Sequence, residues 1–194
     1  MQLKQSVVLF LFFCGWIQPF WAFAGPSPTI TLRGQPLTLV GQTLAVGQPL
    51  PDILLPDAGM NGVKLNSFRG QVTLISIVPS IDTKVCEKQT HILSEENNGL
   101  DATVRLVTIS RDLPFAQKRF SENANIKNIL FLSDYRGAQF GRNTGLLIKE
   151  SQLLARAVLV LDKEGIIRYL EIVPELVQLP KMQKAFDFAK TLGE

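Results

Sequence analysis

Histidine and cysteine are the scarcest reactive residues in this chain, whose 194 residues include one histidine and two cysteines. No Cys-x-x-Cys pair occurs, which argues against a disulfide oxidoreductase. So few nitrogen and sulfur ligands predict no metal site. The formal net charge is only +3 at pH 7, so electrostatics gives no case for nucleic-acid binding. No repeat, low-complexity tract or Ser/Gly linker follows residue 25, so a single domain is expected.

Hydrophobic runs are also short, and the longest lies at the N-terminus. Lys4 precedes the apolar residues 7–17, and Ala22-Phe23-Ala24 follows. This order predicts a secretory signal peptide over residues 1–24, with the domain occupying residues 25–194 and an exported, periplasmic location. The run of 11 residues is too short to span a bilayer comfortably, but an uncleaved anchor remains an alternative.

Cleavage after residue 24 would leave 170 of the 194 residues, a net charge of +2, no tryptophan and the single cysteine Cys86. A domain of that size buries enough apolar surface to fold without disulfides. One unpaired thiol in an exported protein therefore needs an explanation. It is either a buried structural residue or a reactive one.

The remaining chain alternates between apolar, β-branched runs and helical periodicities. Strands are predicted over residues 71–78, 103–110 and 129–132, and hairpins over 29–40 and 157–173. Helices are predicted over residues 85–93, 114–123, 134–142 and 180–192. This order predicts an α/β fold, with a mixed sheet flanked by helices and an N-terminal β-hairpin. A thioredoxin-like fold fits, although periodicity alone does not separate it from other α/β folds.

The segment around Cys86 lies where a buried strand gives way to a helix. Thr83 is a favourable N-cap residue, which would put Cys86 in the first helical turn. A thiolate there faces unpaired backbone N–H groups and the positive end of the helix dipole. Strand ends of this kind are where reactive groups gather in α/β sheets.

A helix terminus alone cannot activate a thiol. Lowering a thiol pKa from about 8.5 to about 6 takes roughly 3.4 kcal/mol, whereas a helix end contributes about 0.3–1 kcal/mol and at most about 2. A cation is therefore needed, and Arg156, just before the strand at 157–161, is the candidate. Its guanidinium could also orient a peroxide and stabilise the leaving oxygen. The alternative is that Thr83 only caps a helix and Arg156 is a solvated charge.

Several other side chains have structural interpretations. His91 is expected to be an exposed helix residue, and Asp112 to cap the helix that begins near Pro114. Phe115 is expected in the core or in a pocket wall.

Two motifs resemble those of a known family. Residues 79–86, PSIDTKVC, resemble the peroxiredoxin pattern Pro-x-x-x-Thr-x-x-Cys. Residues 110–120, SRDLPFAQKRF, are similar to the signature of the bacterial thiol peroxidase branch, and the resemblance covers nearly all of residues 29–193. It implies a thioredoxin-like fold and reduction of hydroperoxides. Neither a metal nor an organic cofactor is implied.

The resemblance also implies roles for four residues. Cys86 would be the peroxidatic nucleophile that becomes a sulfenic acid, and Thr83 would hydrogen-bond the peroxide and thiolate. Arg156 would be the cation of the pocket, and Pro79 would shield the sulfur from water. Members of the family are commonly dimers, so a homodimer is expected.

One position departs from the family pattern. The resolving cysteine normally follows the Arg-Phe of the second motif, and Ser121 stands there. A hydroxyl cannot replace a thiol in disulfide exchange, so an external thiol of unknown identity must reduce the sulfenic acid. The function expected is therefore a one-cysteine peroxidase acting on hydrogen peroxide and organic hydroperoxides. The alternatives are an exported redox sensor and a non-catalytic thioredoxin-fold binding module.

Overall fold

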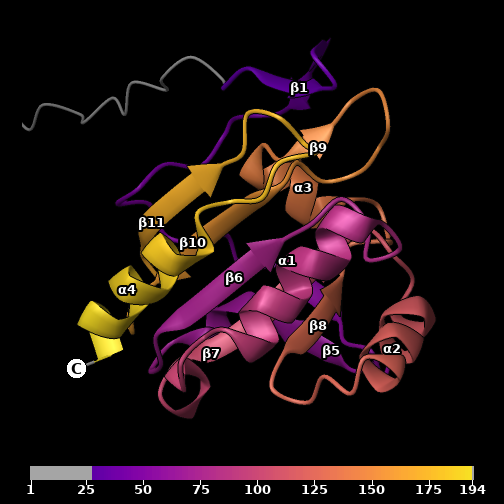
Figure 1. Ribbon diagram of the computed structural model, residues 1–194. Coiled ribbons are helices and arrows are strands. Elements are labelled where there is room, and N and C mark those ends of the chain that lie inside the picture. Colours follow the sequence, from indigo (N-terminus) through magenta and orange to yellow (C-terminus); the bar gives the residue numbers. More distant parts are fainter. Residues whose placement is uncertain (1–27, 194) are drawn as a thin grey trace, which may run out of the picture.

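A central five-stranded sheet organises the protein. The computed structural model describes residues 28–193, so the predicted signal peptide over 1–24 lies outside the described residues. The strand order is β11-β10-β6-β7-β8, with β6, β7 and β8 parallel and with β10 antiparallel to both β6 and β11 (Figure 1). These strands are β6 (Thr73–Ile77), β7 (Arg105–Ser110), β8 (Leu130–Ser133), β10 (Ala157–Leu161) and β11 (Ile167–Ile172).

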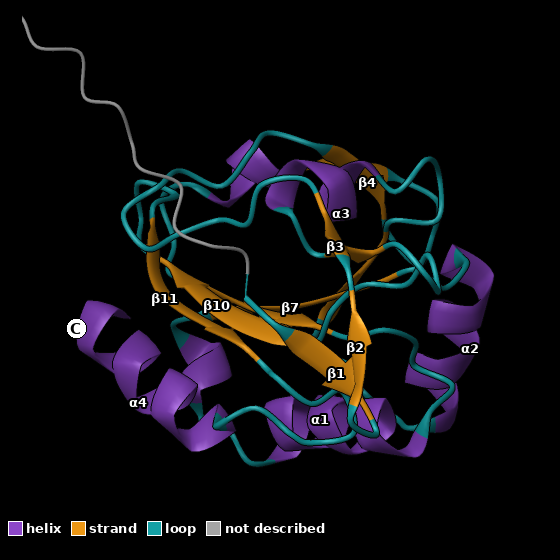
Figure 2. Cartoon of the chain, turned by 90° about the horizontal axis from the view of Figure 1, so that it is seen from above, coloured by secondary structure: helices purple, strands orange, loops and turns teal. Residues whose placement is uncertain are grey.

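Helices and short strands cover both faces of this sheet. One face packs against α1 (Lys84–Glu95) and α4 (Met182–Gly193), and α2 (Pro114–Asn123) contacts the edge strand β8. The other face is covered by α3 (Gln139–Thr144) and by the segments that carry β3 (Leu39–Val40) and β4 (Leu54–Pro56) (Figure 2). Because both faces are covered, every residue of β6 and β10 is buried, which explains their continuous apolar runs.

Small hairpins and turns complete the fold. β1 (Ile30–Leu32) pairs with β2 (Gln35–Leu37), and β4 pairs with β5 (Gly62–Lys64). β3 pairs with β9 (Leu147–Ile148), and the 3-10 helices are η1 (Leu65–Phe68) and η2 (Leu100–Ala102).

The predicted mixed sheet, its flanking helices and the N-terminal hairpin are confirmed. One expectation for a single element is wrong, and two small elements were not predicted. The helix predicted over 134–142 begins only at Gln139, because Asp134 uses its carboxylate to accept the N–H groups of Phe140 and Gly141. The β4–β5 hairpin and β9 were not expected, because their strands have only two or three residues. Across residues 28–193, no helix has the length and apolar character needed to cross a membrane.

Candidate functional site

Cys86 lies in the first turn of α1, the helix that follows β6 after a short loop. Thr83 occupies the N-cap position with extended backbone angles, as the sequence predicts. Its hydroxyl, however, donates to the carbonyl oxygen of Ser80 at 3.3 Å, and no side-chain cap hydrogen bond forms. The Cys86 side chain is 0% exposed and packs in a small apolar cluster with Val78 and Ile81. The thiol is therefore held in an apolar setting at the start of a helix.

Arg156, the residue immediately before β10, contacts this thiol with its guanidinium. Its Nη2 lies 3.4 Å from Sγ of Cys86, and its side chain is only 2% exposed. Nε donates to the carbonyl of Leu176 at 2.9 Å. Within residues 28–193 no carboxylate pairs with this guanidinium, since the three ion pairs found there involve other residues. Burying a cation without a counter-charge is costly, so Arg156 depends on these hydrogen-bond partners inside the site.

Gln89 and Ser76 hold the other side of the guanidinium. Nη1 of Arg156 donates to Oε1 of Gln89 at 2.7 Å, and Nε2 of Gln89 donates to Oγ of Ser76 at 2.8 Å. Gln89 and Ser76 are both 0% exposed. Each side-chain nitrogen and oxygen in this series of hydrogen bonds thus has a defined donor or acceptor, which fixes the orientation of the Arg156 guanidinium.

Asp112 fixes the loop between β6 and α1. Its carboxylate accepts the hydroxyl of Ser80 at 2.7 Å and the N–H of Ile81 at 2.8 Å. The expectation that Asp112 caps α2 is wrong, because Leu113 occupies the N-cap position and Asp112 binds across to the neighbouring loop. The expectation for Phe115 is also wrong, since its side chain is 62% exposed.

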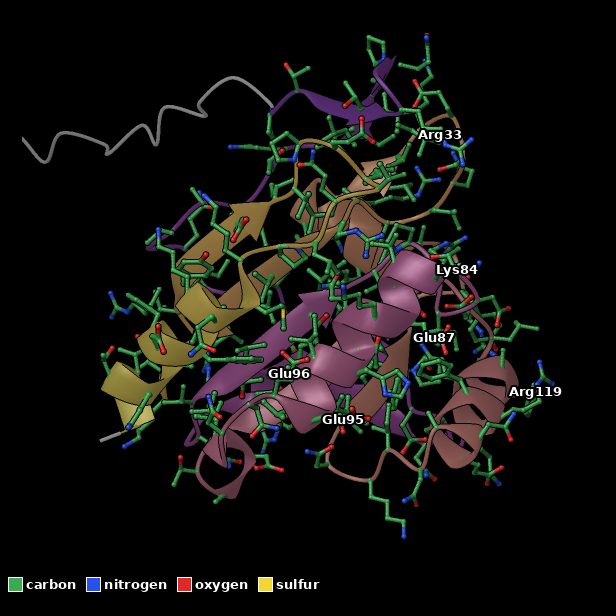
Figure 3. All side chains as sticks on the ribbon, in the orientation of Figure 1. Arg33, Lys84, Glu87, Glu95, Glu96 and Arg119 are labelled. Carbon is green, nitrogen blue, oxygen red and sulfur yellow. The ribbon has the colours of Figure 1, made fainter. Side chains whose placement is uncertain are left out.

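A cavity of about 430 Å³ adjoins this site and is bordered by Pro79, Thr83 and Arg156. Eight of the thirteen described residues that line it are apolar. They come from the hairpin β1–β2, the loop after β6, the first turn of α1, β9 and the loop after it, and the segment after β11. Arg33 and Lys84 border the same cavity from the hairpin and from the start of α1, and Figure 3 labels both. A small molecule with an apolar body could therefore reach the guanidinium next to Cys86.

The hairpin is held over this cavity by Glu175. The Glu175 carboxylate accepts the N–H of Arg33 at 2.9 Å, the N–H of Gly34 at 3.0 Å and the hydroxyl of Thr31 at 2.8 Å. The backbone N–H donors of Gly34 and Arg33 lower the pKa of Glu175 to about 2 from its usual 4.5. Leu176 links the two parts, because its N–H donates to Thr31 and its carbonyl accepts from Arg156.

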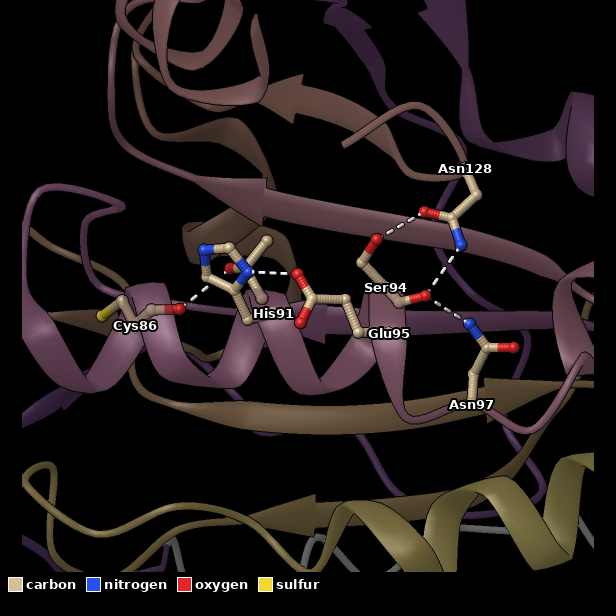
Figure 4. A network of polar contacts seen from close by, with 7 residues as sticks. Cys86, His91, Ser94, Glu95, Asn97 and Asn128 are labelled. Carbon is tan, nitrogen blue, oxygen red and sulfur yellow. Dashed lines mark hydrogen bonds and ion pairs between the residues drawn. The ribbon is translucent and has the colours of Figure 1, made fainter. Parts of the chain in front are cut away.

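The sole histidine lies further along α1. Nδ1 of His91 is 2.6 Å from Oε1 of Glu95, and the imidazole packs edge-on against Phe120. Its side chain is 32% exposed, so it is half-buried rather than exposed as expected. Figure 4 shows Nδ1 of the ring directed toward Glu95. We therefore give His91 no part in the chemistry of the thiol.

Of the sequence-predicted site residues, the fold brings Cys86 and Arg156 into contact and places Pro79 and Thr83 at the same cavity. The interpretation of Arg156 as a solvated charge is wrong. The roles implied for these four residues stay predictions. Over residues 28–193, no group of three His, Cys, Asp or Glu side chains could hold a metal ion.

Gln89, Ser76 and Asp112 were not identified from the sequence as parts of the site. The signals were present for two of them. Gln89 follows Cys86 by three residues, which puts both on one face of a helix. Ser76 interrupts an apolar strand, where a polar side chain needs a partner.

Comparison with known proteins gives consistent matches over most of the chain. Residues 45–186 match the redoxin family. A thiol peroxidase of Staphylococcus saprophyticus is 42% identical over 158 residues, covering 81% of this chain and 95% of that protein. A thiol peroxidase of Bacillus subtilis is 44% identical over 163 residues, covering 84% of this chain and 97% of that protein.

Solved structures agree with these matches. The crystal structure of a peroxiredoxin-like protein from Aquifex aeolicus superimposes with a TM-score of 0.80 at 37% identity, covering 86% of this chain and 98% of the other. A thiol peroxidase from Chromobacterium violaceum superimposes with a TM-score of 0.74 at 22% identity, covering 86% of this chain and 97% of the other. These neighbours confirm the thioredoxin-like fold.

Proposed function

The chain belongs to the redoxin family and, within it, to the thiol peroxidases of the peroxiredoxin kind. From this membership we propose that it reduces hydroperoxides through Cys86 and an external thiol. The observation that carries the proposal is the contact of 3.4 Å between Nη2 of Arg156 and Sγ of Cys86. A buried cation with no carboxylate partner among the described residues stabilises the thiolate, which is the nucleophilic form.

The proposed chemistry has two stages. The thiolate of Cys86 attacks the terminal oxygen of the hydroperoxide, the O–O bond breaks, and an alkoxide or hydroxide leaves and takes up a proton. Cys86 becomes a sulfenic acid. Arg156 stabilises the charge that develops on the departing oxygen. The hydroxyl of Thr83 orients the peroxide, and Pro79 excludes water from one side of the sulfur.

The second stage returns Cys86 to a thiol. An external thiol attacks the sulfenic sulfur and releases water, and a second external thiol then reduces the mixed disulfide. The sum consumes one hydroperoxide and two thiols and yields an alcohol, water and one disulfide. Ser121 motivates this one-cysteine scheme, because the described residues contain Cys86 as their only thiol.

A single-turnover experiment tests the proposal without a known reductant. The reduced protein is mixed with one equivalent of hydrogen peroxide near pH 7, and sulfenic acid is trapped with a dimedone-type reagent and followed by mass spectrometry. We expect rapid, stoichiometric labelling at Cys86 and none in Cys86→Ser. Labelling no faster than that of free cysteine would overturn the peroxidase.

The same experiment, followed by a turnover assay with added thiols, separates the peroxidase from the two alternatives. A sensor would form sulfenic acid stoichiometrically but would not turn over with any of a panel of dithiol and monothiol reductants. A binding module would not form sulfenic acid faster than free cysteine does.

We also propose that the protein is exported to the periplasm, by cleavage after residue 24, and that it forms a homodimer. N-terminal sequencing of the periplasmic form and light scattering would test these two proposals.

A further inference from the structure

The mouth of the cavity next to Cys86 carries charge of one sign. Among the residues that the structure describes, its charged lining consists of Arg33, Lys84 and Arg156, with no aspartate or glutamate. Arg156 is committed inside the site, because its three donor nitrogens bond Leu176, Gln89 and Cys86. Arg33 and Lys84 are exposed, and among the described residues neither side chain has a hydrogen bond or an ion pair. Two cations are therefore left for a ligand at the mouth.

The position of Arg33 is set by the fold. Arg33 lies at the turn of the β1–β2 hairpin with a positive φ of 51°, and its N–H is bound by Glu175. The Glu175 carboxylate is occupied by hydrogen bonds from the hairpin backbone and makes no ion pair with the Arg33 guanidinium. Lys84 is the first residue of α1 and faces the same cavity. Figure 3 shows both residues on one side of the molecule.

The wall below these cations is apolar. Leu32 and Val177 border the cavity and are 43% and 44% exposed, which is high for large apolar side chains. An apolar wall beneath a cationic rim is complementary to a molecule with an apolar body and one anionic end. The neighbouring groove between α1 and α2 differs, because Asp82 and Glu87 border it together with Arg119.

We propose that Arg33 and Lys84 form a carboxylate subsite for a reactant whose apolar body lies along the cavity and whose other end reaches Cys86. This inference rests on the proposed function, since it assigns a recognition element to the same site. The carboxylate belongs to a hydroperoxide in the oxidation stage or to a thiol in the reduction stage. Both reactants must reach the sulfur of Cys86, and the cavity offers them one charged mouth.

Matched pairs of reactants test the subsite. In the oxidation arm, sulfenic acid formation is timed with a medium-chain alkyl hydroperoxide that ends in a carboxylate and with its methyl ester. In the reduction arm, preformed sulfenic acid is reduced by a mercaptoalkanoate and by its methyl ester. We expect a carboxylate preference of about threefold to tenfold in at least one arm, which decreases as ionic strength is raised.

Variants then assign the preference to its residues. Arg33→Gln combined with Lys84→Gln should bring the carboxylate-to-ester ratio close to one, whereas Arg119→Gln, an exposed arginine on α2, should keep the wild-type ratio. A preference in the oxidation arm places the carboxylate on the hydroperoxide, and one in the reduction arm places it on the thiol.

Equal rates for acid and ester in both arms of the wild-type protein would overturn the subsite, whatever the behaviour of the variants. That result would leave the proposed function intact as long as hydrogen peroxide still oxidises Cys86 rapidly. Slow oxidation by hydrogen peroxide would instead count against the proposed function itself.

Discussion

Arg156 and Cys86 are 70 residues apart in the chain, and Nη2 of the arginine lies 3.4 Å from Sγ of the cysteine. Antiparallel pairing of β6 with β10 brings about this contact, because the end of β6 meets the start of β10. The register pairs Ala157 with Ile77, so the residue before β10 lies beside the loop that carries the thiol. The sheet thus places a cation at a helix start that cannot by itself activate a thiol.

Removing the guanidinium should slow the oxidation of Cys86. For Arg156→Met, which keeps much of the buried volume, we expect the second-order rate constant with hydrogen peroxide to fall about 100-fold, as when one donor to a developing anion is removed. Stopped-flow measurement of sulfenic acid formation would show this. Circular dichroism would establish that the variant is folded. An unchanged rate in a folded variant would exclude Arg156 from the chemistry.

Gln89 should act on the reaction through Arg156. Gln89→Met removes the acceptor of Nη1, and we expect the rate of Cys86 oxidation to fall about tenfold because the guanidinium loses one of its fixed partners.

Ser76→Ala leaves the buried Nε2 donor of Gln89 unpaired and should lower the free energy of unfolding by about 1–3 kcal/mol.

The double variant tests whether Ser76 affects the rate of Cys86 oxidation only through its hydrogen bond with Gln89. If Ser76 acts only by orienting Gln89, then Ser76→Ala combined with Gln89→Met should be no slower than Gln89→Met alone. Multiplicative effects on the rate would mean that Ser76 reaches the site by another route.

The sequence predicts the layout of the fold better than the contacts of the site. Residues 114–123 are correctly predicted as a helix, because Pro114 marks its start and the helical period follows. The burial of Arg156 could not be predicted, because it depends on the pairing of β10 with β6. The expectation that Asp112 caps the helix near Pro114 failed because its partners, Ser80 and Ile81, are more than thirty residues away in the chain. The local pattern of apolar residues predicts helices and strands, whereas the pairing of strands far apart in the chain decides which side chains come into contact.

The hairpin should depend on the charge of Glu175. The folded pKa of about 2 lies below the usual 4.5, so the carboxylate stabilises the docked hairpin above about pH 4.5 and loses that effect as pH falls through about 2. Glu175→Gln should therefore loosen residues 30–37 at neutral pH and increase their hydrogen exchange about threefold to tenfold. Exchange measured by mass spectrometry would show this.

An exposed glutamate provides the control for that measurement. The Glu122 carboxylate contacts Lys118 at 4.0 Å and has no other ion pair among the described residues, so Glu122→Gln should leave the exchange of the hairpin unchanged. Equal exchange of residues 30–37 in Glu175→Gln and in the wild-type protein would show that the backbone pairing of Thr31 with Pro174 and Leu176 holds the hairpin alone.

Restoring a thiol at position 121 should change how the sulfenic acid is resolved. Ser121 lies in α2 next to Phe120, and Phe120 packs against the apolar cluster that contains Cys86. Because Cys86 is fully buried, a bond between the two positions requires the first turn of α1 or part of α2 to open. We expect Ser121→Cys to form an intramolecular disulfide after one equivalent of peroxide and to lose trapping by dimedone. Ser67→Cys, on the exposed surface of η1, should keep the trapping of the wild-type protein. Non-reducing peptide mass spectrometry distinguishes the two products, and a persistent sulfenic acid in Ser121→Cys would mean that the helices do not open far enough to bring the sulfurs together.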